Sequence, residues 1–245
     1  ATIEGKAMHN VQNAMFAAAM AYSFDASLEN IRQGLRIFDT SFYQAPGRLN
    51  IYDQHPFKVI LDYAHNPAAF ASITGLATRL DVIGKRRLVI SIPGDRRNED
   101  IIEAARIVAN GFDSFVCKAD DKRRGRGHDE VPQRLKAALI AQGVSAELID
   151  IIPSEVDAVE NALGQCDVGD LLIVLGDDTT RCWKQIIGFN SGTIAKAEDT
   201  LTVSSDFPEK LYQSVEQEFS LEDGQKLVKD DRGVRIVVER DEESD

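Results

Sequence analysis

The stretch 62–67, Asp-Tyr-Ala-His-Asn-Pro, holds the residue types best suited to chemistry, and it lies between an apolar run and a helix-like segment. Asn66 can cap the first turn of that helix, and Pro67 suits its first position because the missing N–H is not needed there. Asp62 and His65 would then lie at the carboxyl end of a strand, the edge where open α/β sheets bind ligands. The alternative is a turn aspartate and a loop histidine without a chemical role.

Two further polar loops, 94–100 and 176–180, also follow apolar, strand-like runs. If the strands are parallel, all three loops meet at one edge of the sheet, where their side chains could form one site. Asp95, Arg96 and Asp177 are the candidate functional residues of these two loops. The alternative roles are turn formation or helix capping for the aspartates and weak surface ion pairs for the arginine.

The one strongly basic cluster, 122–126, has the sequence Lys-Arg-Arg-Gly-Arg and is flanked by acidic residues, among them Glu130. Arg124 and Arg126 would project from a flexible loop around Gly125, and a guanidinium can grip a carboxylate or phosphate with two hydrogen bonds. The cluster is short and surrounded by negative charge. It therefore indicates a site for a small anion rather than a nucleic-acid footprint.

Two features near the amino terminus are weaker. Gly47-Arg48 ends a helical lead-in and begins the alternating pattern, so the guanidinium could reach a neighbouring domain. Asn10 and Asn13 lie one helical turn apart beside His9, and their amides could read an adenine edge. The alternative for the asparagines is that they are polar residues on an otherwise core-facing helix.

Composition is that of a globular protein: 245 residues, 43% hydrophobic and 28% charged. The net charge is −12, and residues 191–245, with 15 acidic and 7 basic side chains, carry −8 of it. This balance argues against general nucleic-acid binding. No apolar run is long enough to span a membrane, and three widely spaced cysteines give neither a disulfide framework nor a metal site, so we expect a cytoplasmic protein without a structural metal.

The order of elements predicts an α/β fold, a mostly parallel Rossmann-like sheet with helices on both faces, preceded by a helical lead-in. The lead-in consists of helices over 8–24 and 27–38, and the first, rich in alanine and methionine, is expected to be buried on most faces. The expected strands are 49–52, 57–61, 88–92, 114–118, 146–151 and 171–175, the first forming an antiparallel hairpin at an edge. The expected helices are 68–80, 99–110, 131–142, 154–163 and 180–187.

After residue 190 the pattern weakens, with one amphipathic helix expected over 206–221, a strand over 233–238 and disorder over 241–245. The chain is expected to divide at 1–45, 46–190 and 191–245, the last part being an acidic extension. The chain begins without methionine inside what looks like a continuing element, which suggests a piece of a longer polypeptide.

Taken in order, the motifs at 9–13, 47–48 and 62–67 resemble the last part of the Mur ligases, the ATP-dependent amide ligases of peptidoglycan synthesis. The runs 92–100 and 124–126 make the chain most similar to the Mur-ligase-like half of cyanophycin synthetases. The resemblance covers about residues 5–189. It implies that a carboxylate and ATP form an acyl phosphate, which an amine attacks to give an amide; in cyanophycin synthetases this half joins arginine to aspartate side chains.

The resemblance also implies roles for single residues. His9, Asn10, Asn13 and Tyr63 would surround the adenine, with His65 beside them. Asp62 would hold the ribose and Arg48 would approach the terminal phosphate. The incoming amino acid and its acceptor would be bound by Asp95, Arg96, Arg124, Arg126, Glu130 and Asp177.

Several parts expected of such an enzyme are absent from these 245 residues. No phosphate-binding Gly-x-x-x-x-Gly-Lys-Ser/Thr loop occurs. The resemblance places that loop, the magnesium ligands and the rest of a central ATP-binding domain upstream, residues 1–45 being its helical end. The expectation is therefore a fragment that is inactive alone and that needs ATP, Mg, an amino acid or acidic peptide and the missing ligase domains as partners. A stand-alone, non-catalytic α/β binding module is the alternative, and a ligase acting on a muramyl peptide is a third interpretation.

Overall fold

The computed structural model describes residues 1–189, 225–230 and 233–238. It divides into two compact units, Ala1–Glu198 and Asp199–Asp245. In the second unit the described residues form an antiparallel hairpin of β7 (Gln225–Asp230) and β8 (Gly233–Val238). The strand expected over 233–238 is confirmed, whereas β7 was not predicted. The expected helix 206–221 and the expected disorder at 241–245 lie outside the described residues.

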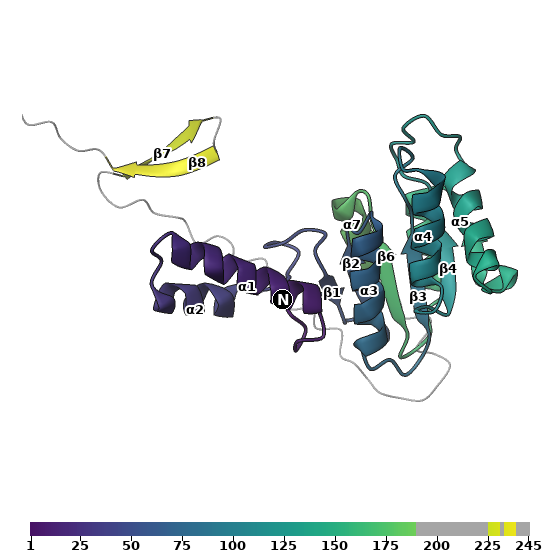
Figure 1. The fold of residues 1–245 in the computed structure, drawn as a ribbon, viewed down its shortest axis with the longest axis horizontal. Helices are drawn as coiled ribbons and strands as arrows, with labels where there is room; N and C mark the ends of the chain where they lie inside the picture. Colours follow the sequence, from purple (N-terminus) through teal and green to yellow (C-terminus); the bar gives the residue numbers. More distant parts are fainter. Residues whose placement is uncertain (190–224, 231–232, 239–245) are drawn as a thin grey trace, which may run out of the picture. The chain divides into compact units, whose positions relative to one another are not determined.

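The first unit contains a six-stranded sheet in the order β1-β2-β6-β3-β4-β5 (Figure 1). Its strands are β1 (Asn50–Tyr52), β2 (Lys58–Asp62), β3 (Arg86–Ile90), β4 (Ser114–Cys117), β5 (Ile149–Ile151) and β6 (Leu171–Leu175). All neighbours are parallel except β1, which pairs antiparallel with β2 at the edge. The predicted parallel sheet with an antiparallel edge hairpin is confirmed.

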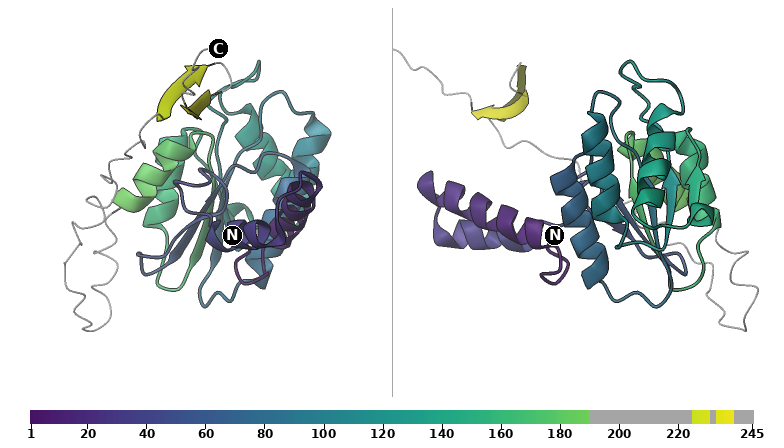
Figure 2. Two further views of the ribbon diagram at one scale, coloured as in Figure 1. Left: turned by 90° about the vertical axis from the view of Figure 1, so that its left-hand side faces the viewer. Right: turned by 45° about the vertical axis from the view of Figure 1, so that its right-hand side comes forward.

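Five helices cover the two faces of this sheet (Figure 2). They are α3 (Pro67–Arg79), α4 (Asn98–Val108), α5 (Glu130–Ala141), α6 (Glu155–Gly164) and α7 (Thr179–Gly188). Side chains of α3, α4 and α5 pack with Ile60 and Ile173, whereas side chains of α6 and α7 pack with Val59 and Val174. Successive strand residues thus face opposite layers, as the pleat of a strand requires. The predicted helices on both faces are confirmed.

The helical lead-in consists of α1 (Met8–Ser23) and α2 (Leu28–Ile37), which lie side by side (Figure 1). Ser27 caps α2 as its sequence suggests, accepting a hydrogen bond from the amide N of Asn30 at 3.1 Å. The expectation that α1 is buried on most faces is wrong, because no residue of α1 or α2 is buried. Met15, Phe16 and Phe24 are among the exposed apolar side chains.

One strand is shorter than predicted. Residues 146–151 were expected to be a single strand, but Ala146–Leu148 form a turn of 3-10 helix and only β5, Ile149–Ile151, joins the sheet. Ser145 and Glu147 are polar, and their local hydrogen bonding competes with the strand ladder at that point. No helix of the described residues is long and apolar enough to cross a bilayer.

Candidate active site at the carboxyl edge of the sheet

The three polar loops singled out in the sequence meet at one edge of the sheet. Strands β2 and β6 are parallel neighbours with Asp62 opposite Leu175, and the Gly176 amide donates to the Asp62 carbonyl at 3.0 Å. Strand β3, which precedes the loop at 94–100, is parallel to β6 on its other side. The predicted convergence is therefore confirmed, since the strands that end at these loops run side by side in the same direction.

Arg48 lies on a short segment that is tied to the β2 loop. The residues on either side of it, Gly47 and Leu49, both have positive φ, at 69° and 49°. The Tyr63 amide donates to the Gly47 carbonyl at 2.9 Å, and the Leu49 amide donates to Asp62 Oδ2 at 3.0 Å. The Arg48 guanidinium carbon lies 5.7 Å from the centre of the Tyr63 ring. Arg48 is thus brought to the edge where the predicted nucleotide-binding residues lie.

The Asp62 carboxylate interacts with the segment that carries Arg48, through the Leu49 amide and the Arg48 charge. Its side chain is buried, and burial raises the pKa of the Asp62 carboxyl, while the Leu49 amide and the charge of Arg48 oppose that rise. Burial also lowers the pKa of His9, and the charge of Asp62 opposes that change. Arg48 and His9 therefore both lie close enough to Asp62 for their charges to act on its carboxyl.

The rings of Tyr63, which is exposed, and His65, which is half-buried, form an aromatic pair beside Arg48. Their ring centroids are 5.1 Å apart, and His65 Nδ1 lies 2.9 Å from the Tyr63 carbonyl oxygen. Tyr63 keeps 38% of its surface exposed. A flat, partly exposed ring next to a guanidinium offers a surface on which a heterocycle can stack.

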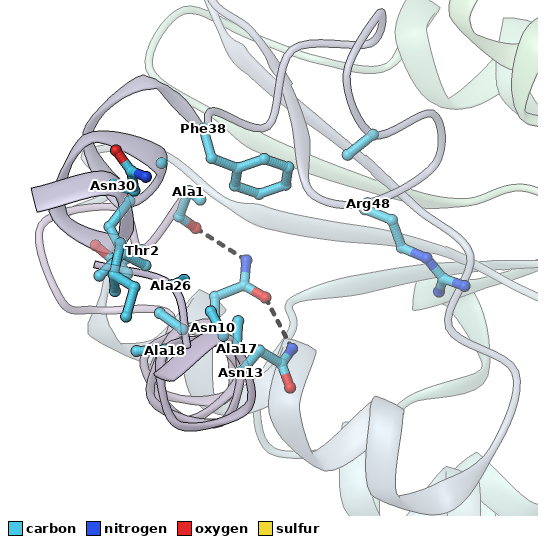
Figure 3. A pocket seen from close by; sticks show the side chains of 16 residues that line it. Ala1, Thr2, Asn10, Asn13, Ala17, Ala18, Ala26, Asn30, Phe38 and Arg48 are labelled. Carbon is cyan, nitrogen blue, oxygen red and sulfur yellow. Dashed lines mark hydrogen bonds between the residues drawn. The ribbon is translucent and has the colours of Figure 1, made fainter. Parts of the chain in front are cut away.

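A cavity of about 710 Å³ opens along α1 and α2, within the size range of small-molecule pockets. Figure 3 shows Asn10, Asn13 and Arg48 among its lining side chains. The Asn10 amide donates to the Ala1 carbonyl at 2.9 Å, and the Asn13 amide donates to Asn10 Oδ1 at 3.3 Å. The rest of the lining is mainly small and apolar. The two asparagines and Arg48 thus share one hollow, whereas Asp62 lies outside its lining.

The other predicted residues lie around the 94–100 and 122–130 loops. Arg124 Nη1 contacts Asp95 Oδ2 at 2.7 Å, and both side chains are about half exposed. Arg126 connects the 122–130 loop to the 94–100 loop. Its guanidinium donates to the Gly94 and Arg96 carbonyls at 2.7 and 2.6 Å. Within its own loop it also pairs with Glu130 at 2.7 Å.

The hydrogen bonds of Arg126 fix the position of the 94–100 loop relative to the 122–130 loop. Because Arg126 uses its Nε and both Nη atoms in hydrogen bonds inside the protein, it contributes rigidity to the site. The Arg96 Nε atom, by contrast, is buried and has no hydrogen-bond partner among the described residues. Arg96 thus keeps one unpaired donor among the described residues, and the Arg124 guanidinium donates a hydrogen bond to Asp95 through Nη1.

We expect Gly94→Ala to lower the free energy of unfolding by about 1–3 kcal/mol, because overpacking of a close contact forces the backbone to move. A Cβ atom at Gly94 would overlap the Arg123 carbonyl oxygen, which is backbone and cannot turn away. Urea denaturation of the two proteins measures the difference.

The matched control for that variant is Gly164→Ala, because a Cβ at this helical glycine meets nothing within 4 Å. Alanine favours the helix there, so stability should stay equal or rise slightly. Equal stability of Gly94→Ala and the parent protein would show that the two loops do not depend on this close approach.

A buried ionic cluster behind the Asp177 loop was not predicted. The Lys118 side chain is fully buried, with Nζ 2.8 Å from Glu155 Oε2 and 3.1 Å from Asp177 Oδ2. Glu155 also accepts from the amides of Asp177 and Asp178, at 2.7 and 3.1 Å, and from Arg181 at 2.5 Å. Asp177 is thus held by a buried ammonium rather than by helix capping; it is Asp178 that caps α7.

The charges of this cluster compensate one another. Burial alone would raise the pKa of Glu155. The charge of Lys118 and the hydrogen bonds that Glu155 accepts from Lys118, the Asp177 amide and Arg181 instead lower that pKa to about 2. Burial alone would lower the pKa of Lys118, yet the two carboxylates raise it above its usual value. Burial raises the pKa of Asp177, and Lys118 opposes the rise. At neutral pH the lysine and the glutamate are both charged.

The sequence held only a faint signal for this cluster. Lys118 ends a predicted strand and Glu155 opens a predicted helix, positions at which lysine and glutamate are ordinarily solvated. An acidic side chain in the first turn of a helix is stabilised by the helix dipole. Glu155 could therefore be explained from the sequence without a buried partner. The pairing of Lys118 with Glu155 can be recognised only from the tertiary structure, which brings the end of β4 and the start of α6 to the same edge of the sheet. Among the described residues, no group of three or more His, Cys, Asp or Glu side chains could hold a metal ion.

Comparison with known proteins adds to this geometry. Residues 47–177 match the model of the Mur ligase glutamate ligase domain, and the match begins beside Arg48. Cyanophycin synthetases from Geminocystis herdmanii and Crocosphaera subtropica are 34% and 33% identical over 179 and 180 residues, covering 73% and 74% of this chain. The chain spans about a fifth of the length of these relatives, since each alignment covers 20% of the other protein.

Solved structures give the same fold. The D-alanyl-D-alanyl-adding ligase of Acinetobacter baumannii superposes with a TM-score of 0.52 and 21% identity, covering 74% of this chain and 37% of that one. A pseudomurein peptide ligase type C from Methanothermus fervidus gives a TM-score of 0.52 at 20% identity, covering 74% and 36%. The domain match over more than half of the chain shows that it belongs to the Mur ligase family, as a C-terminal Mur-ligase-like region of the kind found in cyanophycin synthetases.

Proposed function

We propose that this chain is the C-terminal portion of an ATP-dependent amide ligase of the cyanophycin synthetase type. The reaction would join an arginine-like amino acid to a carboxylate through an acyl phosphate. The observation that carries the proposal is the convergence of Arg48, the Asp62–His65 loop and the Asp177 loop at one sheet edge, inside the region that matches the family. Three free, buried cysteines suit the reducing cytoplasm in which we place the enzyme.

The nucleotide side of the site would be formed by His9, Asn10, Asn13, Tyr63 and His65, with Asp62 near the ribose. A cavity whose walls are mostly apolar, with three side-chain amides and one guanidinium, fits a base and a phosphate. Bound ATP would supply the phosphoryl group that activates the carboxylate. Arg48 would hold that group, since a fixed guanidinium stabilises the charge that develops during transfer.

The substrate side would be formed by Asp95, Arg96, Arg124, Arg126, Glu130 and Asp177. Arg96 and Arg124 would bind carboxylates, with Arg126 and Glu130 holding the loops in place. Asp177 is partly exposed, with its carboxylate fixed by Lys118, so it could meet a cationic amino acid. Its negative charge favours an arginine-like substrate over an acidic one.

The remaining parts of the enzyme would lie in ligase domains upstream of this chain. We propose that residues 1–45 are the helical end of a central ATP-binding domain, which would also carry the phosphate loop and the magnesium ligands. The exposed apolar side chains of α1 and α2, including Met15, Phe16 and Leu28, support this. Several large apolar side chains exposed on one pair of helices are what we expect of a face that another protein surface covers. The fragment alone would then be inactive, and residues 191–245 would be an extension of it.

The test is ADP release by the full-length protein with ATP, Mg²⁺, a short acidic peptide and a panel of single amino acids. We expect release that depends on both peptide and amino acid and is fastest with arginine or lysine. The 245-residue chain alone should release no ADP under the same conditions. Amino-acid-dependent release by that chain alone would contradict the proposal, and so would a full-length protein that binds ATP but never turns it over.

A further inference from the structure

The segment that carries Arg48 is held in an uncommon backbone conformation. Arg48 itself is exposed, but Gly47 and Leu49 on either side of it have φ values of 69° and 49°. A leucine in the left-handed region is rare, because its Cβ crowds the carbonyl oxygen. Such a conformation persists only where surrounding contacts impose it. The question is therefore which side chains impose it here.

Asn50, the first residue of β1, supplies three of those contacts. Its side chain is fully buried. Its Oδ1 accepts from the Gly47 amide at 2.7 Å, and its Nδ2 donates to the carbonyls of Thr40 and Ala45 at 2.8 and 2.9 Å. One carboxamide thus uses its acceptor and both of its donors to tie the turn before Arg48 to the edge strand.

The end of β2 and the residue after it hold the backbone on both sides of Arg48. Asp62 accepts from the Leu49 amide, and the Tyr63 amide donates to the Gly47 carbonyl. The Arg48 amide donates to the Ala45 carbonyl at 3.1 Å, the same oxygen that Asn50 contacts. The peptide groups before and after Arg48 are therefore both anchored, and Asn50 anchors the next peptide group toward the amino terminus, through the Gly47 amide.

Resting on the role proposed above for Arg48, we propose that Asn50 is a positioning residue for the ligase reaction. It does not touch the reactants. It fixes the backbone from which the Arg48 guanidinium reaches the transferred phosphoryl group. Catalysis by a preorganised charge depends on its placement, and a shift of about 1 Å can cost about 100-fold in rate.

The test is a double-mutant cycle in the full-length protein, with Asn50→Ala and Arg48→Ala made singly and together. We expect Asn50→Ala to lower kcat about 10- to 100-fold and to change KM for ATP and for the amino acid by less than about 3-fold. In the Arg48→Ala background the same change should lower kcat less than about 2-fold. That loss of effect is the signature of a residue that acts through Arg48.

Stability is measured separately, because Asn50→Ala also removes buried hydrogen bonds. Leu139→Ala, a truncation at the far end of α5 where the side chain is fully buried, is the control. It should lower Tm and leave kcat per folded molecule unchanged in both backgrounds. If Asn50→Ala is not recovered folded, Asn50→Ser, which keeps a hydroxyl in a smaller side chain, takes its place in the cycle.

Two outcomes would overturn the inference, and they differ from failure of the proposed function. An equal fall in kcat with and without Arg48 would show that Asn50 has only a structural role. An unchanged kcat in folded Asn50→Ala would remove it from the reaction altogether. If Arg48→Ala itself leaves kcat unchanged, the proposed role of Arg48 fails and the positioning role of Asn50 fails with it.

Discussion

Replacing Arg48 by alanine in the full-length protein is expected to lower kcat for amide formation about 10²- to 10³-fold, the usual cost of removing one preorganised donor from a developing charge. The side chain is exposed, and its guanidinium lies over the Tyr63 ring, so the fold does not depend on it. KM for ATP should rise much less than kcat falls, because the contact strengthens in the transition state. Steady-state ADP release and a thermal melt measure the two effects.

Two variants sharpen this prediction. Arg48→Lys keeps the charge but loses the planar, two-pronged donor, so it should recover only part of the rate. Arg32→Ala is the matched control, because Arg32 is an exposed arginine on α2 whose recorded partner is Glu29, at 3.1 Å. A normal rate in Arg48→Ala would remove Arg48 from the active site.

Replacing Lys118 by methionine is expected to destabilise the 245-residue chain by about 3–5 kcal/mol, the range for a buried ion pair that loses one partner. The change leaves the buried Glu155 carboxylate facing Asp177 without the ammonium between them. Lys118→Met combined with Glu155→Gln should regain part of the loss, because the uncompensated charge is then gone. Urea denaturation of the parent protein, Lys118→Met, Glu155→Gln and the double variant measures these differences, and additive losses would contradict the pairing.

The same cluster predicts a pH dependence. The folded-state pKa of Glu155 is about 2, below its ordinary value of 4.5, so its contribution to stability is complete above about pH 4.5. It is lost as the pH falls through that range toward 2, and it amounts to about 3 kcal/mol. The pKa of Lys118 is raised, so its contribution is complete below its usual pKa of 10.5 and is lost only at higher pH.

Unfolding measured at pH 6, 4.5 and 3 tests this dependence. In Glu155→Gln the free energy of unfolding should fall less steeply between pH 4.5 and 3 than in the parent protein. The variant should already be less stable at pH 6, since Lys118 has lost a charged partner. Identical slopes would show that other carboxylates set the acid response.

The sheet and its edge could be predicted because the local signals were strong. The apolar run 171–175 coincides with β6, and the polar loops that follow β2 and β6 share one edge, as parallel strands require. Asn66 caps α3 with Pro67 at its first position, as their residue types indicate. At these positions the residue types favoured by local structure are also the ones that the tertiary structure requires.

The misses arise where a residue's role is set by a distant segment. Lys118 is buried only because Glu155 and Asp177 arrive at the same edge from later elements. Asn50 has its role because the chain doubles back so that Thr40, Ala45 and Gly47 surround it. In α1, the Ala- and Met-rich composition indicates a surface that is to be covered, but composition does not say by what, and the described residues leave it exposed.

Gly47 lies so close to the start of α7 that a Cβ there would come within 2.5 Å of Thr179 Cγ2. Gly47, which precedes Arg48, and Thr179, which begins α7, therefore lie against one another, so a change at either residue acts on the backbone of the other. Under the roles proposed for Arg48 and Asp177, replacing the 176–180 loop to change the amino acid that is bound is expected to shift Arg48 as well. A changed amino-acid preference and slower turnover should then occur together, unless position 179 keeps a side chain no larger than threonine.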